Sequence, residues 1–535
     1  MNSSFDGIIL GTGHNALVLQ AYLSRCGLRT LSVDRAPMPG GGLRTIDNPR
    51  LPGFRHNPHS FFHRAATAMP WYRDLELERH GVRYLEPELN VAMILRDGRV
   101  LEWWTDLDRT VAICAEFSKR DAEVLRQFAE EFKPIVQKIL LPEAQSSPLD
   151  PGLRRKLLER SVLGRRLLEI SALSPLAFVT RYFENDAVRA GLLFFNGLRE
   201  VDLRLKDFGH SIPALLASRP MAQMAVGGSA SLAHGFLADI SEHGGEVRCG
   251  VELRRILVQN GQTKGIELTT GEQIHAAFVA SGLNPQQTFL DLLPPEAVPA
   301  RVRERAAQFQ YNLLAPLFGL HVALDEPPRY AAAGLHPELN EAFMVLIGLE
   351  QFDQFHEIVA AHERGELPPP VAWGACPTLF DPSQARPGKH AAFLWEKLPY
   401  ALRGDPSNWA REKEAVGARL LNLWRELAPN LGRSIIKDQF VLTPADTETT
   451  LPNMSRGDLL VGSFANSQVG YNRPFAGAGC YRTPVAGVYL CGGSTHPGGN
   501  ITGLCGYNAA RVIATDLGKS IWWRPPDAEQ ALAAL

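Results

Sequence analysis

The first part of the chain alternates apolar runs with turn-forming residues in an order that predicts strand, helix and strand. Residues 8–10 are apolar, residues 11–13 hold two glycines, and residues 14–23 are mostly apolar over a length that suits a helix. Residues 28–34 form another short run, which ends at Asp34. Short apolar runs bounded by glycine favour buried strands of a parallel sheet. The pattern therefore predicts a β-α-β unit.

The glycine spacing inside this unit indicates a dinucleotide site. The turn reads Gly11-Thr12-Gly13-His14-Asn15-Ala16, with Ala16 where a third glycine is usual. Gly11 suits a tight turn, and Gly13 allows the backbone to approach a pyrophosphate. The helix that follows offers free N–H groups and the positive end of its dipole to phosphate. Asp34, at the end of the second strand, is placed to accept hydrogen bonds from ribose hydroxyls.

A second glycine run decides between dinucleotides. After Pro37 and Pro39 interrupt regular structure, Gly40, Gly41 and Gly42 lead to Thr45. An acid, a short spacer and Gly-Gly-x-x-x-Thr is the arrangement of two-dinucleotide flavoproteins, in which the backbone folds back over a pyrophosphate that the first turn already holds. It favours FAD over NAD, and Arg35 lies between the two elements.

The cofactor pattern returns twice further along. Gly227-Gly228 opens a predicted helix to Glu242, followed by a strand over 246–253, a hairpin turned at Asn260-Gly261, and a last strand that ends at Gly282. Residues 488–490 form a third apolar run before Gly492, Gly493 and a glycine-rich loop. The next helix would again point its N-terminus at an electron-rich acceptor.

Two intervening regions predict a second domain. After a hairpin with an Asp97-Gly98 turn, the chain reads as helical from Ser118 to Ala217, and residues 300–440 alternate strands and helices. We expect the FAD-binding domain to comprise 1–80, 220–300 and 440–520, and a substrate domain to comprise 81–219 and 301–439.

One stretch of the helical region, residues 153–170, is basic and leucine-rich, which is typical of membrane-surface helices. Its charges and leucines lie all around the helical wheel, so the favoured interpretation is a solvated helix pair split at Gly164. Peripheral membrane contact stays an alternative.

Composition excludes several classes of function. The 535 residues are 45% hydrophobic and 21% charged, with a net charge of −2, so no basic stripe indicates a nucleic-acid partner. Seven scattered cysteines without C-x-x-C spacing exclude a dithiol redox pair and fit a reducing compartment. The first strand begins too early to leave room for a signal peptide, and no apolar run reaches the ~18 residues of a bilayer span. We expect a cytoplasmic protein.

The four glycine-containing blocks together resemble the carotenoid-desaturase-like FAD oxidoreductases, which include phytoene desaturases, FAD-dependent carotene ketolases and proteins with a pyridine-nucleotide-disulfide-oxidoreductase domain. The resemblance covers nearly the whole chain and is strongest in the last block. It implies a monoamine-oxidase-like α/β fold, in which a two-dinucleotide Rossmann-type domain is interleaved with a substrate domain, and non-covalent FAD. It also implies that Leu253 binds adenine through its backbone and that Ile501 and Thr502 meet the flavin pyrimidine edge. The mid-chain match is weak, so the substrate does not transfer.

The predicted cofactor-binding residues are Gly11, Gly13, His14, Asn15, Ala16, Asp34, Arg35, Gly40, Gly41, Thr45, Leu253, Gly282, Gly492, Gly493, Ile501 and Thr502. Because flavin itself accepts hydride, few catalytic side chains are needed. His59 and His496 are the candidate bases, each with a purely structural alternative. Tyr471, Asn472 and Arg473 either face the cavity or brace the last cofactor loop. No metal cluster is predicted.

Three functions remain open from the sequence. The first is an FAD-dependent dehydrogenase or oxidase of a small apolar organic substrate, with oxygen, a quinone or another carrier as electron acceptor because the chain has one complete fingerprint and no NAD(P)H module. A redox-neutral double-bond isomerase and a non-catalytic FAD-containing interaction protein are the alternatives. For the first, runs such as 192–195 and 313–318 would wall an apolar chamber, with Phe194 and Phe318 as its test positions. The alternative for these runs is plain core.

Overall fold

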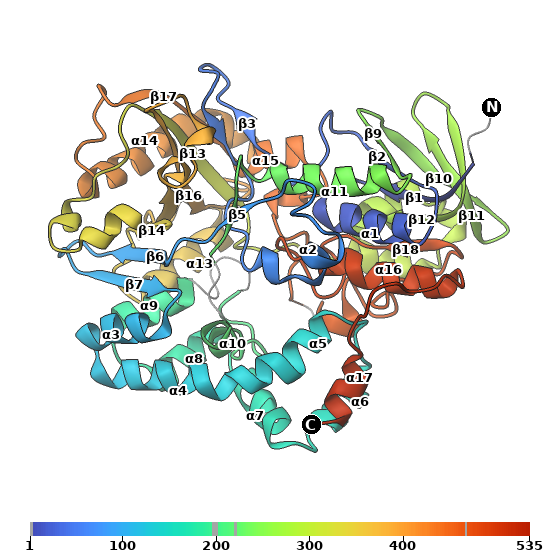
Figure 1. Ribbon diagram of the computed structural model, residues 1–535, viewed down its shortest axis with the longest axis horizontal. Helices are drawn as coiled ribbons and strands as arrows, with labels where there is room; N and C mark the ends of the chain where they lie inside the picture. Colours follow the sequence, from blue (N-terminus) through green and yellow to red (C-terminus); the bar gives the residue numbers. More distant parts are fainter. Residues whose placement is uncertain (1–3, 195–201, 219–221, 466–467) are drawn as a thin grey trace.

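Two seven-stranded sheets lie side by side, with a layer of helices below one of them (Figure 1). The computed structural model describes residues 4–194, 202–218, 222–465 and 468–535. Phe195, one of the predicted chamber residues, lies outside the described residues.

The first sheet collects strands from three distant parts of the chain. Its order is β10-β11-β12-β1-β2-β9, with β18 paired to β12. Strands β12, β1, β2 and β9 run parallel, as does β18 beside β12, and β10-β11-β12 is antiparallel. The strands are β1 (Ser4–Leu10), β2 (Thr30–Asp34), β9 (Glu246–Cys249), β10 (Leu253–Gln259), β11 (Gln262–Leu268), β12 (Gln273–Ser281) and β18 (Val488–Leu490).

Three helices share one hydrophobic core against this sheet: α1 (His14–Arg25), α11 (Ala230–Glu242) and α16 (Leu504–Asp516). Helix α1 is buried nearly all round, from Asn15 to Ser24, because helices and sheet enclose it. Gly506 allows α16 to approach α1, since a Cβ there would lie 1.9 Å from the carbonyl oxygen of Asn15. The predicted first unit, strand, helix and strand, is confirmed.

The second sheet has the order β17-β13-β16-β15-β14-β6-β7, antiparallel except for β14 beside β6. Its strands are β6 (Leu89–Ile94), β7 (Val100–Trp104), β13 (Leu317–Leu324), β14 (Met344–Ile347), β15 (Ala372–Ala375), β16 (His390–Lys397) and β17 (Ile436–Leu442). Two short ribbons join the halves: β3 (Ile46–Asp47) with β4 (Arg55–His56), and β5 (Tyr84–Leu85) with β8 (Met224–Ala225).

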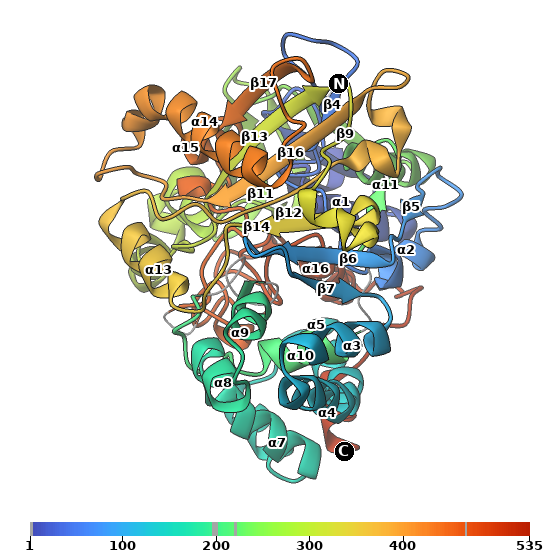
Figure 2. The same cartoon turned by 90° about the vertical axis from the view of Figure 1, so that its left-hand side faces the viewer.

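Helices cover both faces of the second sheet. Figure 2 shows a helical layer below β6 and β7, and α14 (Trp409–Leu427) packs into the core of the opposite face. The layer consists of α3 (Leu107–Phe117), α4 (Lys119–Ile135), a π-helical turn (Val136–Leu140), α5 (Leu141–Ala144), α6 (Pro151–Leu158), α7 (Val162–Ser171), α8 (Pro175–Tyr182), α9 (Asp186–Leu193) and α10 (Ser211–Ala217). The other α-helices are α2 (Pro70–Asp74), α12 (Ala300–Ala307), α13 (Gln354–Arg364), α15 (Pro444–Thr450) and α17 (Ala528–Ala533).

Three local predictions differ from the structure. Helix α3 precedes the predicted helical start, because Asp106 caps it and accepts hydrogen bonds from the backbone of residues 108 and 109. The basic helix pair divides at 159–161, not at Gly164. Gly164 lies inside α7, where a Cβ would stand 2.1 Å from the carbonyl oxygen of Leu158. The strand predicted over 246–253 is two strands, since Gly250 has a φ of +72° and interrupts the extended backbone between β9 and β10.

Within the described residues, none of the helices is both long enough and apolar enough to cross a membrane. The exact domain boundaries predicted above stay a prediction.

Candidate functional site

The two glycines of the first turn differ in what they require. Gly11 has a φ of +90°, a left-handed value that strains any other residue. Gly13 caps α1 with a φ of −63° and a ψ of 159°, which any residue adopts, and a Cβ there would meet nothing within 4 Å. Neither backbone geometry nor packing thus explains glycine at position 13. The side of Gly13 where a side chain would project is open.

Asp34 is fixed at the end of β2 by the turn itself. Its Oδ2 accepts hydrogen bonds from the backbone N–H of Thr12 at 2.8 Å and from the Thr12 hydroxyl at 2.7 Å. Its Oδ1 accepts one from the backbone of Ala36 at 2.9 Å. The carboxylate therefore lies beside the glycine turn.

The second glycine run folds over the first. Gly40 donates its N–H to the carbonyl of Thr12 at 3.0 Å and forms a β-bridge with Gly13. Gly40 and Gly41 have φ values of +114° and +57°. Thr45 ties this loop to α11, because its hydroxyl accepts the N–H of Ala230 at 3.1 Å. The two runs thus form one loop system.

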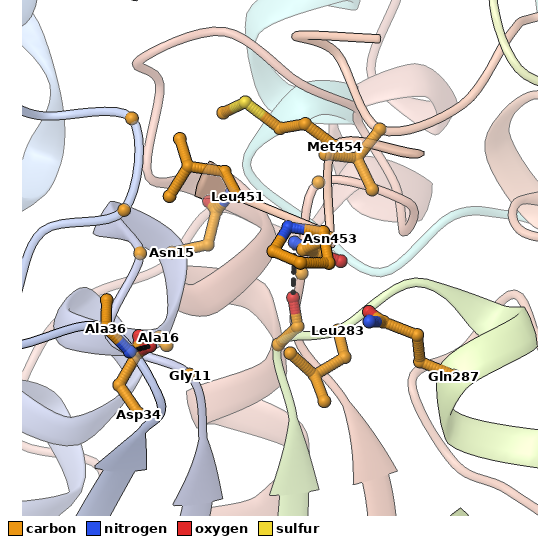
Figure 3. Close-up of a pocket in the computed structure, with 18 of the residues that line it drawn as sticks. Gly11, Asn15, Ala16, Asp34, Ala36, Leu283, Gln287, Leu451, Asn453 and Met454 are labelled. Carbon is orange, nitrogen blue, oxygen red and sulfur yellow. Dashed lines mark hydrogen bonds between the residues drawn. The ribbon is translucent and has the colours of Figure 1, made fainter. Parts of the chain in front are cut away.

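A cavity of about 360 Å³ opens beside these loops. Figure 3 shows Asn15 and Asp34 on one side, Asn453 and neighbouring residues above, and Gln287 on the right. The predicted residues that line this cavity are Gly11, Gly13, His14, Asn15, Ala16, Asp34, Arg35, Gly41, Leu253, Gly282, Gly492 and Gly493. Twelve predicted positions from three segments therefore meet at one cavity.

Four predicted cofactor residues lie elsewhere. Gly40 and Thr45 support the loops, and Ile501 lines a neighbouring chamber. Thr502 accepts a hydrogen bond at its carbonyl from the indole N–H of Trp71 at 2.6 Å, and it lines neither cavity. Its contact with the flavin stays a prediction.

One wall of the larger cavity consists of residues that were not predicted from the sequence. Residues 450–454 and 459–461 line the cavity, as do Gln287 and Asp291. The wall segments carry no glycine fingerprint, and they reach the cavity only because the chain returns from the second sheet. Asn453 attaches this wall to the first sheet by donating its side-chain N–H to the carbonyl of Gly282 at 3.3 Å.

Buried polar atoms along the larger cavity lack a partner within the described protein. They are His14 Nε2, Asn15 Oδ1, Gln287 Oε1 and Asn453 Oδ1. A buried polar atom without a hydrogen bond costs about 1–3 kcal/mol, so such a set indicates a polar ligand or ordered water. With the open side of Gly13 and a helix N-terminus, these residues fit a large, phosphate-containing ligand.

A chamber of about 100 Å³ adjoins the larger cavity. Both cavities are lined by His14, Gly42, Met454, Leu459, Leu460 and Asn500. The chamber adds aromatic walls together with His59 and Lys397; the aromatic residues are Phe61, Phe62, Trp373 and Trp395. The cavity beside the glycine loops thus continues into an aromatic chamber.

The two candidate bases have different surroundings. His59 lines the chamber, its Nε2 lies 3.3 Å from the Thr447 hydroxyl oxygen, and its Nδ1 has no partner within the described protein. Burial and then the cation of Arg44 lower the pKa of His59 to about 4. His496 lines neither cavity, and its Nε2 is 2.8 Å from the carbonyl oxygen of Glu143. Burial likewise lowers the pKa of His496 to about 4. Of these two candidates, His59 lines the chamber and His496 does not.

Arg473 braces the last cofactor loop, one of the two roles predicted for its cluster. It is fully buried, and its guanidinium donates to the carbonyl oxygens of residues 462, 463, 468, 493 and 495 at 3.0–3.2 Å. Tyr471, in contrast, is 36% exposed. Arg473 therefore holds residues 462 and 463, which follow the cavity-lining residues 459–461, against the glycine loop.

The predicted chamber walls need correction. Phe318 stacks on Trp409 in the core on the far side of the second sheet, while its neighbour Leu317 lines the chamber. Successive strand residues point to opposite faces, so the two cannot share a face. Phe194 is 1% exposed and packs edge-on against Trp373 at 5.4 Å, one layer behind the chamber lining.

Among the described residues, there is no group of three His, Cys, Asp or Glu side chains that could hold a metal ion.

Several known proteins are similar to this chain in sequence over nearly its whole length. It is 30% identical to a limonene dehydrogenase component from Castellaniella defragrans, over 98% of this chain and 96% of that one. It is 26% identical to pyridine nucleotide-disulfide oxidoreductase domain-containing protein 2 of Rattus norvegicus (97% and 94% covered), and 23% identical to the lycopene-forming phytoene desaturase of Pseudescherichia vulneris (93% and 96%). No family model matches the chain.

Solved structures share the fold. An oxidoreductase from Methanosarcina mazei superimposes with a TM-score of 0.61 at 16% identity, over 96% of this chain and 100% of that one. Cyclohexylamine oxidase from Brevibacterium oxydans does so with a TM-score of 0.59 at 15% identity, over 97% and 100%. The expected fold, that of an amine oxidase with interleaved domains, is confirmed. The chain belongs to the carotenoid-desaturase-like family of flavin oxidoreductases.

Proposed function

We propose that the protein binds FAD non-covalently in the larger cavity and oxidises a small apolar organic molecule in the adjoining chamber. The observation that carries this proposal is the continuity of the two cavities, which share six lining residues. A cavity lined by glycine loops, a helix N-terminus and Asp34 suits an extended dinucleotide, and an aromatic chamber at its end suits a hydrocarbon.

Each part of the cleft has a proposed task. The N-terminus of α1 and the open side of Gly13 receive the pyrophosphate, and Asp34 receives the ribose hydroxyls. The backbone at Leu253 lies at the same cavity and is proposed to meet adenine. Asn500, which lines both cavities, marks the junction with the chamber.

Bound FAD would supply the hydride acceptor, so the protein must position the substrate, exclude water and receive one proton. The aromatic rings of the chamber do the first two. His59 is neutral near pH 7 because its pKa is about 4, and a neutral imidazole accepts a proton. We propose His59 as the base and assign His496 a structural role.

The substrate class follows from the chamber and from the relatives' names, which mention limonene, phytoene and carotene. We propose an apolar hydrocarbon or a closely related terpenoid. Only one glycine fingerprint of the dinucleotide type precedes a helix within the described ranges, so oxygen, a quinone or another carrier is the proposed electron acceptor rather than NAD(P)⁺.

Two measurements test this proposal. Acid precipitation of the purified protein, followed by chromatography, should leave FAD in the supernatant. Adding limonene without air should bleach the flavin absorbance, whereas NADH alone should not. A colourless protein that cannot be reconstituted with FAD would refute the cofactor, and rapid bleaching by micromolar NADH would refute the proposed acceptor class.

A further inference from the structure

His321 is a buried histidine near the chamber, and neither of its ring nitrogens has a hydrogen-bond partner within the described protein. His321, on β13, is 0% exposed, and both Nδ1 and Nε2 lack a hydrogen-bond partner within the described protein. His321 and Leu317 lie four residues apart on one strand, so they share the face that looks toward the chamber. The ring of His321 stacks on Phe440 at 4.9 Å and 13°.

Polar groups extend from His321 in both directions. His59, which lines the chamber, contributes to the lowered pKa of His321, and the ring of His56 meets the ring of His321 edge-on at 5.3 Å. Asp438 lies two residues from Phe440 on β17 and so on the same face of the strand, and the ring of Phe440 meets the ring of His56 edge-on at 5.1 Å. The side chain of Asp438 is 18% exposed, and its Oδ1 accepts a hydrogen bond from Arg50 Nε at 3.0 Å. The row therefore runs from the chamber wall to the protein surface.

Every member of this row has a buried atom without a hydrogen-bond partner in the described protein: His59 Nδ1, both nitrogens of His321, His56 Nε2 and Asp438 Oδ2. Isolated unsatisfied atoms of this kind are rare, because each costs about 1–3 kcal/mol. Ordered water molecules, each with two to four polar partners, would satisfy a contiguous row. Phe393 and Phe440 flank His321, so apolar rings shield the row from the sides.

We propose that His59, His321, His56 and Asp438, bridged by water, form a path that carries a proton from the chamber to solvent. This inference rests on the proposed function. If a C–C single bond of the substrate is to become a double bond, bound FAD would accept hydride from one C–H bond, and the neighbouring C–H bond would lose a proton while its electron pair forms the double bond. That proton passes to His59. Each imidazole then accepts a proton at one nitrogen and releases one from the other, until Asp438 delivers it to water.

The surroundings of the three histidines favour release of a proton over its retention on a ring. Arg44 and His321 act on His59, and Lys397 lines the same chamber. His59 and His56 act on His321, and His321 and Asp438 act on His56. Burial lowers the pKa of all three histidines, with Arg44 adding to the effect at His59. None of the three histidines therefore retains a proton near pH 7, and the partly exposed Asp438 is the member of the row that meets solvent.

The test replaces His321 by phenylalanine. A phenyl ring keeps the stacking on Phe440 but removes both nitrogens, so His321→Phe should fold with normal FAD content and unchanged or higher stability. Turnover with limonene should fall at least ten-fold. In stopped flow with a pH indicator, proton release should lag behind flavin bleaching, and the D₂O solvent isotope effect should rise. Phe440→Leu, which removes the stacked ring and leaves the row intact, should keep normal proton release.

Two further measurements keep the test decisive. Asp438→Asn, at the partly exposed end, should slow proton release and be rescued by millimolar imidazole buffer. A high-resolution crystal structure of the cofactor-free protein should show ordered waters between the row members, independent of activity. Absence of these waters, or an unchanged turnover and isotope effect in His321→Phe, would overturn the path. If the wild type never bleaches with substrate, the proposed function fails instead.

Discussion

Alanine substitutions at Gly11 and Gly13 distinguish a glycine that the backbone conformation requires from a glycine that ligand binding requires. At Gly13 the backbone suits any residue and a Cβ meets open space. Gly13→Ala should therefore leave the cofactor-free protein as stable as the wild type, or more stable by about 0.4–1 kcal/mol, because alanine restricts the unfolded chain. At Gly11 the φ of +90° makes alanine strained, and Gly11→Ala should destabilise by about 1–2 kcal/mol.

Gly13→Ala, which should leave the stability of the cofactor-free protein intact, should nevertheless weaken FAD binding. A methyl group at position 13 projects into the space proposed for the pyrophosphate, and overpacking costs about 1–3 kcal/mol. Since 1.4 kcal/mol is a factor of ten, FAD affinity should fall roughly 5- to 150-fold in Gly13→Ala. Gly13→Val should weaken binding further.

The assay is urea denaturation of each cofactor-free protein, followed by FAD titration monitored by flavin fluorescence. The reasoning is refuted if Gly13→Ala loses as much stability as Gly11→Ala, because the space at Gly13 would then not be open. It is also refuted if Gly13→Ala binds FAD with unchanged affinity.

Three further predictions concern the wall, the buried histidines and the chamber. Arg473→Met should lower the free energy of unfolding by about 3–5 kcal/mol and weaken FAD binding, because it removes five buried hydrogen bonds to backbone carbonyl oxygens. Arg473→Lys should cause a smaller loss. Equal denaturation midpoints for the wild type and both variants would contradict this. Burial lowers the pKa of His14 and His56 to about 4, as it does for His59 and His496. Below pH 6.5 the unfolded chain binds protons that these folded-state histidines do not, so stability should decrease as pH falls from 6.5 toward 4, by up to about 1.4 kcal/mol per pH unit for each histidine. Urea midpoints that stay constant from pH 7 to 5 would exclude this. Leu317→Phe should raise KM for the substrate with normal FAD content, while Phe318→Ala should cost about 3–5 kcal/mol in stability without a specific change in KM; the opposite pattern would reverse the assignment of the two faces.

The cofactor half could be predicted from sequence because each of its parts is local. Gly11, Gly13 and Asp34 lie within one strand-helix-strand unit, whose turn, helix start and strand end follow from neighbouring residues. The same holds for Gly492 and Gly493, between a short strand and a helix. Within each unit, local spacing places these groups at the carboxyl end of a strand, and the parallel pairing of β1, β2, β12 and β18 brings those ends to one edge of the sheet.

The chamber was decided by tertiary structure. Alternation along β13 shows that Leu317 and Phe318 face opposite ways, but only its pairing with β16 and β17, and the packing of α14, decide which faces the cavity. His59 and His496 are both loop histidines in the sequence. They differ because His59 meets Thr447, 388 residues away, whereas His496 meets the carbonyl of Glu143, 353 residues away. Contacts of such separation depend on how whole domains pack, and no local pattern of residues encodes them.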